Sequence, residues 1–341
     1  MKRNDTLDIA KGLGMLFVIF GHLGWSFAFR ATYPFHMPLF FLVAGWLLSE
    51  RLEPKAYFLR RAKGLLPAYL FTAVCMIVLS GISALASGKA VPSALLRTFI
   101  RALYGSGLTA NKSLFGIGQI GAIWFLLAML EATVFVRWLI ARVPKIPLQC
   151  VVVLALFAAS CISAKVVWLP LSLQAGGAAA LYVWLGWLAK KQRQQTALPK
   201  TPALPGIAVG LGAAAWVAAY ALDRGLMVCS ASFPAFWATI PLSLVIVCGV
   251  IGLAAFLSRV DCLRRALGFL GRHSLMLLSF HLMELDYAPW YLLYNVMEGA
   301  GWPELPRFAA VYLLKVLLCV GLTFAALRIP FLRRVFGEKE A

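Results

Sequence analysis

Ten long runs of apolar residues recur along the 341-residue chain, and they constrain its fold more than any other feature. They cover residues 13–29, 35–48, 65–86, 120–140, 148–164, 173–189, 204–222, 236–257, 267–282 and 308–327. Most approach the roughly 20 residues that a helix needs to cross a bilayer, whereas 35–48 and 267–282 are short enough to be tilted or partly re-entrant. With 62% hydrophobic and 13% charged residues, a soluble fold would lack a polar surface. We therefore expect an all-α polytopic bundle of about ten spanning helices. We expect one integral-membrane domain over residues 1–341 and no separate soluble domain.

The basic residues are distributed unevenly between alternate loops, and this bias predicts the orientation of the chain. Most lie at the two chain ends and in the loops after the second, fourth, sixth and eighth apolar runs. Lysine and arginine in short loops stay on the cytoplasmic side. We therefore expect a multi-pass protein of the cell (inner) membrane with both termini in the cytoplasm. Residues 87–119 and 284–306 are then long non-cytoplasmic loops. Because no small-x-small cleavage site follows residues 13–29, that run is interpreted as a retained first helix and not as a signal peptide.

The formal net charge of +19 follows this topology instead of gathering on one domain or helix face. It therefore indicates orientation and attraction to the anionic headgroups of membrane lipids, and it does not indicate a nucleic-acid partner. The seven cysteines show no paired spacing and mostly fall in apolar runs. They predict neither a disulfide framework nor a metal site.

The first apolar run carries an unusual polar stripe. Lys11 and His22 are eleven residues apart, which is three helical turns and roughly 16 Å on one face of a helix. Asp8 lies one turn before Lys11 on the same stripe. The pattern predicts a polar track that leads from the cytoplasmic surface to a histidine able to exchange a proton near neutral pH. The alternative is a buried histidine that is hydrogen-bonded to a neighbouring helix.

Two further histidines favour a functional site over a structural one. His36 opens the second apolar run after a very short outer loop, so it can fold back toward His22. His281 lies at a similar predicted depth in the ninth run, with Ser274 two turns earlier on the same face. The fourth histidine, His273, follows an arginine at a cytoplasmic helix start and is interpreted as an interfacial residue.

Two other sets of charged residues have open interpretations. Arg60, Arg61 and Lys63 form a basic loop that is either a plain topology signal, which composition favours, or a clamp for the phosphates of a cytoplasmic ligand. Glu131 lies in the middle of the fourth run, where a carboxylate is costly. It either has a structural partner or points into the same cavity as the histidines.

Several of these residues belong to a recognisable series of short motifs. The series comprises 7–12 (LDIAKG) with Gly21 and His22, 35–41 (FHMPLFF) with Gly45, the pair Leu66 and Pro67 after the basic loop, 124–126 (WFL), and finally Gly271, Ser274, Leu275 and His281. In this order they resemble acyltransferase family 3, and especially the branch that includes fucose 4-O-acetylase-like proteins. The resemblance is dense over the first 130 residues and returns near 271–281.

The resemblance implies an integral-membrane O-acyltransferase that modifies sugars or polysaccharides of the cell envelope. It implies acetyl-CoA or another short acyl-CoA as donor substrate, with no permanently bound cofactor and no metal. It assigns catalytic roles to His22 and Lys11, and its paired-arginine motif maps onto Arg60 and Lys63. We expect Arg60, Arg61 and Lys63 to bind the donor. His36, His281, Glu131 and Ser274 are the candidates for acceptor binding or accessory roles.

The chain departs from the family pattern at three places. Lys11 stands where many members have arginine, and Lys63 replaces the second arginine of a paired motif, which keeps the charge but loses the bidentate fork. Leu278 replaces a frequent tyrosine three residues before His281, which weakens the role of that histidine.

These features predict a reaction in which His22 acts as general base toward a sugar hydroxyl, or carries the acyl group itself. The acceptor is expected to be an envelope glycan or a lipid-linked sugar, and the oligomeric state stays open. A non-enzymatic transporter or flippase of a lipid-linked glycan is the main alternative, and a structural membrane subunit is the second.

Overall fold

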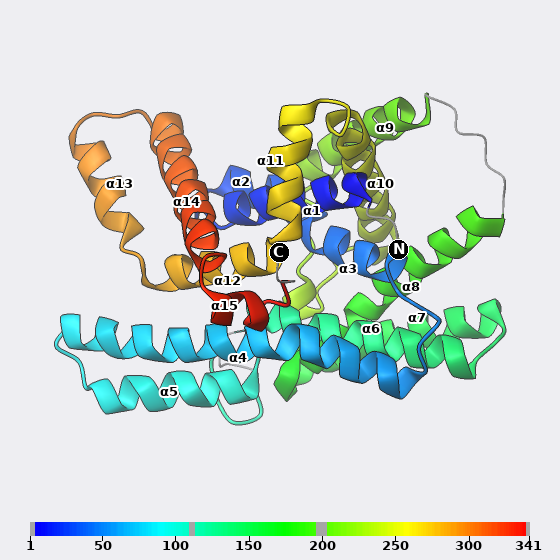
Figure 1. Ribbon diagram of the computed structural model, residues 1–341, viewed down its shortest axis with the longest axis horizontal. Helices are drawn as coiled ribbons and strands as arrows, with labels where there is room; N and C mark the ends of the chain where they lie inside the picture. Colours follow the sequence, from blue (N-terminus) through cyan, green and yellow to red (C-terminus); the bar gives the residue numbers. More distant parts are fainter. Residues whose placement is uncertain (1–3, 109–112, 196–202, 339–341) are drawn as a thin grey trace.

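Helices make up nearly all of the regular structure in the computed structural model, which describes residues 4–108, 113–195 and 203–338 (Figure 1). They are α1 Asp5–Gly21, α2 Ser26–Thr32, α3 His36–Trp46, α4 Pro54–Ala86, α5 Val91–Tyr104, α6 Trp124–Arg142, α7 Ile146–Val166, α8 Leu173–Gln195, α9 Leu204–Ala221, α10 Phe236–Leu257, α11 Asp261–Arg272, α12 Ser274–Tyr287, α13 Trp290–Gly299, α14 Glu304–Ala326 and α15 Pro330–Val335. Within the described ranges, β-structure is limited to two isolated bridges. The expected all-α class is confirmed.

Seven helical segments are long and apolar enough to cross a membrane. Six of these segments, all within the described residues, are the helices α4, α6, α7, α9, α10 and α14. The seventh is Pro170–Gln195, which contains α8. Each coincides with one of the ten apolar runs, so the polytopic membrane architecture is confirmed for seven of them. Prolines in the first turn of α4, α5, α7 and α9 mark where helices begin, because the first turn needs no backbone donor.

The outer face of α4 shows how these helices meet lipid. Its exposed apolar side chains recur at helical spacing and are Leu70, Val74, Val78, Ile82 and Leu85. Leu85 is 73% exposed, which in water would leave a long apolar stripe without a partner. Lipid tails solvate such a stripe, so the pattern fits a membrane protein.

The centre of the bundle is α8, which packs against α3, α6 and α7. Close contact with α3 depends on glycine. A Cβ atom on Gly45 would lie 1.9 Å from the Val183 carbonyl oxygen, and one on Gly186 would lie 2.1 Å from the Leu42 carbonyl oxygen. Small residues that let helix backbones touch are a common means of packing helices in membranes.

The first apolar run, 13–29, is not one helix as the sequence predicted. α1 ends at Gly21, and Gly24 takes a left-handed φ of 74°. The chain then turns back as α2, whose Thr32 side chain lies against Gly21, where a Cβ atom would be 2.4 Å from its hydroxyl oxygen. The reversal of the chain, which hydropathy does not detect, makes the first helix too short to span a bilayer alone.

The two short runs also fall below spanning length. Run 35–48 forms α3, which has 11 residues. Run 267–282 is broken at His273, whose φ of −99° and ψ of 22° separate α11 from α12. The expectation that these runs are atypical is in line with the helices observed. In the described residues, seven helical segments have spanning length, fewer than the expected ten or so.

Both stretches predicted as long loops contain helices. Residues 87–119 include α5, and residues 109–112 of this stretch lie outside the described residues. Residues 284–306 hold the end of α12, all of α13 and the start of α14. Glu284 is therefore a buried helical residue and not part of an acidic loop. The error arises because amphipathic helices of 10 and 14 residues have too many polar positions to register as apolar runs.

Candidate active site

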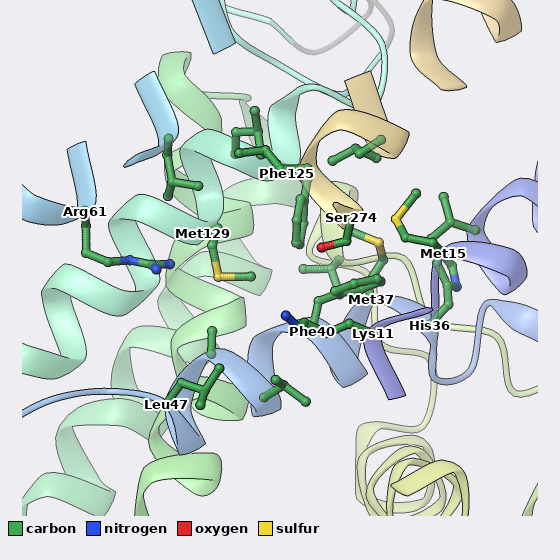
Figure 2. A pocket seen from close by; sticks show the side chains of 18 of the residues that line it. Lys11, Met15, His36, Met37, Phe40, Leu47, Arg61, Phe125, Met129 and Ser274 are labelled. Carbon is green, nitrogen blue, oxygen red and sulfur yellow. The ribbon is translucent and has the colours of Figure 1, made fainter. Parts of the chain in front are cut away.

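A cavity of about 980 Å³ lies where α1, α3, α4, α6 and α12 meet (Figure 2). This volume is at the upper end for a small-molecule site. Figure 2 shows Arg61 at one side of the cavity and His36 and Met15 at the other, with Phe40, Phe125 and Met129 between them. The cavity therefore has a cationic end and a histidine end that are joined by an apolar middle section.

His22 marks the histidine end, at the C-terminus of α1. Its Nδ1 lies 2.8 Å from the Val18 carbonyl oxygen. Because a carbonyl only accepts, Nδ1 carries the proton, and Nε2 keeps a lone pair that can accept a proton. Lys11, Met15 and Val18 line the same cavity, so the predicted polar face of the first helix does face one cavity.

Tyr33 and His36 lie beside His22 at the same end. The Tyr33 ring is 6.3 Å from the His22 ring and 4.8 Å from the His36 ring, centroid to centroid. His36 Nδ1 lies 2.8 Å from the Thr32 carbonyl oxygen, which fixes its tautomer as in His22. The sequence predicted that His36 folds back toward His22, and the α1 to α2 turn brings this about.

His281 lies next to His22 but does not line the cavity. The two imidazole rings are 5.3 Å apart at an interplanar angle of 69°. His281 Nδ1 is 2.6 Å from Glu284 Oε1, and Lys315 Nζ is 2.9 Å from Glu284 Oε2. The Trp290 indole N–H also donates to this carboxylate. A buried ion pair thus supports the imidazole that lies behind His22.

The cationic end of the cavity comprises Arg51, Arg60, Arg61 and Lys190. Arg51 and Arg60 are exposed, so this end reaches the surface. Arg61 Nε is buried and has no hydrogen-bond partner among the described residues, which leaves a donor available to an anion. Lys63 is exposed and lies outside the cavity lining, so the structure brings Arg60 and Arg61, but not Lys63, to this site.

The loop between α3 and α4 holds part of the cationic end in place. The Arg137 guanidinium donates to the Leu52 carbonyl oxygen at 3.0 Å through Nε and to the Glu50 carbonyl oxygen at 3.2 Å through Nη2. The Trp187 indole N–H donates to Glu50 Oε1 at 2.7 Å. Lys190 Nζ donates to the Leu48 carbonyl oxygen at 2.8 Å. These bonds fix a short loop whose own sequence has little structural preference.

Lys11, Ser274 and Glu131 occupy three different environments. Lys11 lines the cavity and forms an ion pair with Asp8 at 2.9 Å. Ser274 lines the cavity from the first residue of α12. Glu131 lies away from the cavity lining and packs against α8, where a Cβ atom on Gly176 would be 2.4 Å from Glu131 Oε2. Glu131 therefore does not point into this cavity, and its buried Oε2 has no hydrogen-bond partner among the described residues.

One cluster of metal-ligand types does occur. Single ligand atoms of His281, Glu284 and Cys319 lie within 4.8 Å of one another, and all three residues are buried. The ammonium group of Lys315 already bonds this carboxylate, and a cation in that position disfavours a second one. Sequence spacing did not indicate the cluster, because its members come from α12 and α14.

Several site residues were missed from the sequence. Tyr33, Arg51, Lys190 and Cys229 all line the cavity. Arg51 and Lys190 had been counted only as topology signals. Tyr33 and Cys229 carry no local pattern, and only the folding of α2 and of residues 226–229 onto the cavity brings them to the histidine end.

Comparison with known proteins identifies the class of this site. Among curated proteins and solved structures, none matches the chain significantly. The model of the acyltransferase domain of acyltransferase family 3 matches residues 4–324. That match covers both ends of the cavity and every helix that lines it. The chain therefore belongs to acyltransferase family 3 and is a multi-pass membrane O-acyltransferase.

Proposed function

We propose that this protein transfers an acetyl or other short acyl group from cytoplasmic acyl-CoA to a hydroxyl of a cell-envelope sugar or polysaccharide. On this proposal residues 1–341 form one domain in the cell (inner) membrane with both termini cytoplasmic. The observation that carries the proposal is that a single cavity joins the cationic end to His22.

Each chemical part of acyl-CoA is assigned to one section of the cavity. Its phosphates bind Arg51, Arg60, Arg61 and Lys190, because guanidinium groups bind phosphate oxygens through paired hydrogen bonds. The narrow pantetheine arm then extends past Phe40, Phe125 and Met129. The thioester reaches His22, Tyr33 and His36 at the far end.

His22 acts as the general base. Nε2 takes the hydroxyl proton while the acceptor oxygen attacks the thioester carbonyl carbon. The tetrahedral intermediate expels CoA as a thiolate, which takes the same proton from His22, so the ester and free CoA are the products. The Tyr33 hydroxyl supports this step as a donor to the transient oxyanion.

The remaining residues position these groups. Lys11, three turns from His22, is assigned to orienting the donor. Ser274 lines the cavity and His36 lies at its histidine end, where both are assigned to the acceptor, and His281 orients His22 through ring contact. Glu131 and Lys63 receive no chemical role, since neither lines the cavity.

An acyl-imidazole at His22 is the alternative chemical route, in which Nε2 itself attacks the thioester. Rapid quenching with acetyl-CoA and without acceptor distinguishes the routes. An acetylated His22 peptide in the mass spectrum would establish the covalent intermediate, and its absence from a preparation that is active once acceptor is added supports general-base catalysis.

The function is tested by reconstituting the full chain in proteoliposomes with isotope-labelled acetyl-CoA on the side of the cationic end. Mass spectrometry of envelope polysaccharides from cells with and without the protein identifies the acceptor. We expect an acetyl group that is lost when the protein is absent. Unaltered acetylation together with unacylated glycan retained inside the cell would instead establish the flippase function.

A further inference from the structure

A second, smaller hollow of about 210 Å³ lies between α4, α5 and the end of α12, and we name it the α5 groove. Three cations line it: Lys89, Arg97 and Arg101. None of its described lining residues is acidic. Arg101 is partly buried, and its Nε has no hydrogen-bond partner among the described residues. Asp286, outside the lining, interacts electrostatically with Arg101, so the groove keeps an excess of positive charge: three cations against this one neighbouring carboxylate.

Hydroxyl groups line the rest of the α5 groove. Tyr287 enters from α12 and approaches the side chains of Thr98 and Ser80. Ser80 also ties α4 to α5, because its hydroxyl donates to the Ile77 carbonyl oxygen at 2.7 Å and approaches the Ala94 carbonyl oxygen at 3.4 Å. Hydroxyls beside cations suit a ligand that carries several hydroxyl groups and a negative charge.

The α5 groove and the cationic end of the cavity lie far apart along the same helix. Arg61 and Ser80 are both in α4, with the first in the cavity lining and the second in the groove lining. Their separation corresponds to roughly 28 Å of helix, close to the thickness of the hydrocarbon core. Figure 1 shows α5 folded back along the part of α4 that is remote from its start. The two sites therefore serve opposite faces of a membrane.

Helix α12 links the α5 groove to the histidine end of the cavity. α12 contributes Ser274 to the cavity, His281 to the neighbourhood of His22, and Tyr287 to the groove. His281 and Tyr287 are separated by roughly 9 Å along the helix. The loop before α6 makes a second connection. A Cβ atom on Gly121 of this loop would lie 2.9 Å from Asp286 Oδ2 in α12, and the adjacent Ala122 lines the cavity.

We propose that the α5 groove binds the acceptor, and that the acceptor is an anionic glycan with a carboxylate or phosphate group. This inference rests on the proposed function and specifies its acceptor. Arg97 and Arg101 bind the anionic group, and the hydroxyls of Thr98 and Tyr287 bind neighbouring sugar hydroxyls. The next part of the glycan then extends along α12 toward His22.

A glycan explains the groove better than a lipid headgroup does. The Arg101 guanidinium is partly buried against the loop after α5, since a Cβ atom on Gly118 would lie 3.1 Å from its Nη2. Thr98 and Ser80, which line the same groove, are buried. A headgroup site would need only exposed cations at the rim, such as Lys89.

The test compares two matched ligands, methyl β-D-glucuronide and methyl β-D-glucoside, which differ by one carboxylate. Calorimetry on the full chain in phosphatidylcholine nanodiscs measures their binding without requiring turnover. We expect the glucuronide to bind about tenfold more tightly. Arg97→Gln/Arg101→Gln should bind the two ligands equally, while Lys165→Gln, an exposed lysine outside the groove lining, should keep the preference.

Three results would overturn the proposal: equal binding to the wild type, a preference that survives in the double variant, or glucuronide binding abolished by phosphatidylglycerol in the discs. The last result would assign the groove to lipid headgroups. If the double variant does not fold, Lys89→Gln replaces it, with a partial loss of preference expected. Acetyl-CoA binding in the same discs reports on the donor site separately, so its failure would count against the proposed function and not against the groove.

Discussion

The lipid-facing long helices of this protein differ in role from the three apolar runs that form only short helices, two of them interrupted and the third short, which we call the interrupted runs. The long helices α7, α9 and α14 expose apolar side chains to lipid over most of their length. The interrupted runs form α1 with α2, α3, and α11 with α12, and each is too short to span a bilayer as one helix. All four histidines lie in or beside the interrupted runs.

This difference shows where a membrane protein can place a reaction. A helix that ends at membrane depth frees backbone groups and polar side chains, and these are tolerated only where other helices or a cavity surround them. α1 ends at His22 in such a place, with α2, α3 and α12 around it. On the proposed function, α7, α9 and α14 form the lipid-facing wall, the short helices supply the histidine end, and the long helices α4 and α8 supply cations for the donor.

The largest expected effect is at the end of α1. His22→Ala should lower the rate of acyl transfer by about 10³, because it removes the general base. His273→Gln, at the break between α11 and α12, should leave the rate nearly unchanged, since His273 bonds Glu338 at 2.6 Å and does not line the cavity. Initial rates with labelled acetyl-CoA measure both. A normal rate of acyl transfer by the His22→Ala variant would show that His22, and with it the end of α1, takes no part in catalysis.

Lys315 in the long helix α14 should contribute to stability through its ion pair with Glu284 in the short helix α12. Lys315→Met leaves Glu284 buried without its ion pair and should destabilise the protein by about 3 kcal/mol. Thermal unfolding in detergent measures the change. The double variant Lys315→Met/Glu284→Gln should recover most of the stability, and Lys165→Met, at an exposed site, should have little effect. An unchanged melting temperature for Lys315→Met would show that the pair contributes nothing to stability.

Close contact between α1 and α11 gives an intermediate effect. A Cβ atom on Gly271 would lie 1.6 Å from the Asp8 carbonyl oxygen, so Gly271→Ala must push these helices apart and should destabilise the fold by about 2 kcal/mol. Gly64→Ala, in the long helix α4, meets no atom within 4 Å. It should be neutral or slightly stabilising, because alanine favours helix. Equal melting temperatures for the two variants would contradict the observed packing.

The smallest effect separates two cations of one basic segment. Arg61→Gln should raise the KM for acetyl-CoA about tenfold with little change in kcat, because it weakens ground-state binding of a phosphate. Lys63→Gln should change neither constant, since Lys63 is exposed and outside the cavity lining. An unchanged KM in both variants would return the whole segment to the role of a topology signal, and matching increases would show that Lys63 also binds the donor.

The sequence by itself determined the membrane class, the positions of the seven spanning helices and the polar face of the first helix. These follow from local properties: the apolar runs needed in lipid, and the repeat that places Lys11 and His22 on one side of a helix. The start of α3 at His36 and of α6 at Trp124 also agree with the sequence motifs. Local patterns of this kind do not depend on which helices become neighbours.

Only the tertiary structure decided which polar residues share a site. It placed Arg61 and Lys190 at one cavity and excluded Glu131 and Lys63 from it. It also paired Glu284 with Lys315 across two helices. The physical reason is that the turn at Gly24, the break at His273 and the glycine contacts between helices act over long distances in sequence. Hydropathy reports only whether a residue tolerates lipid, whereas the cavity depends on which helix faces are buried against each other.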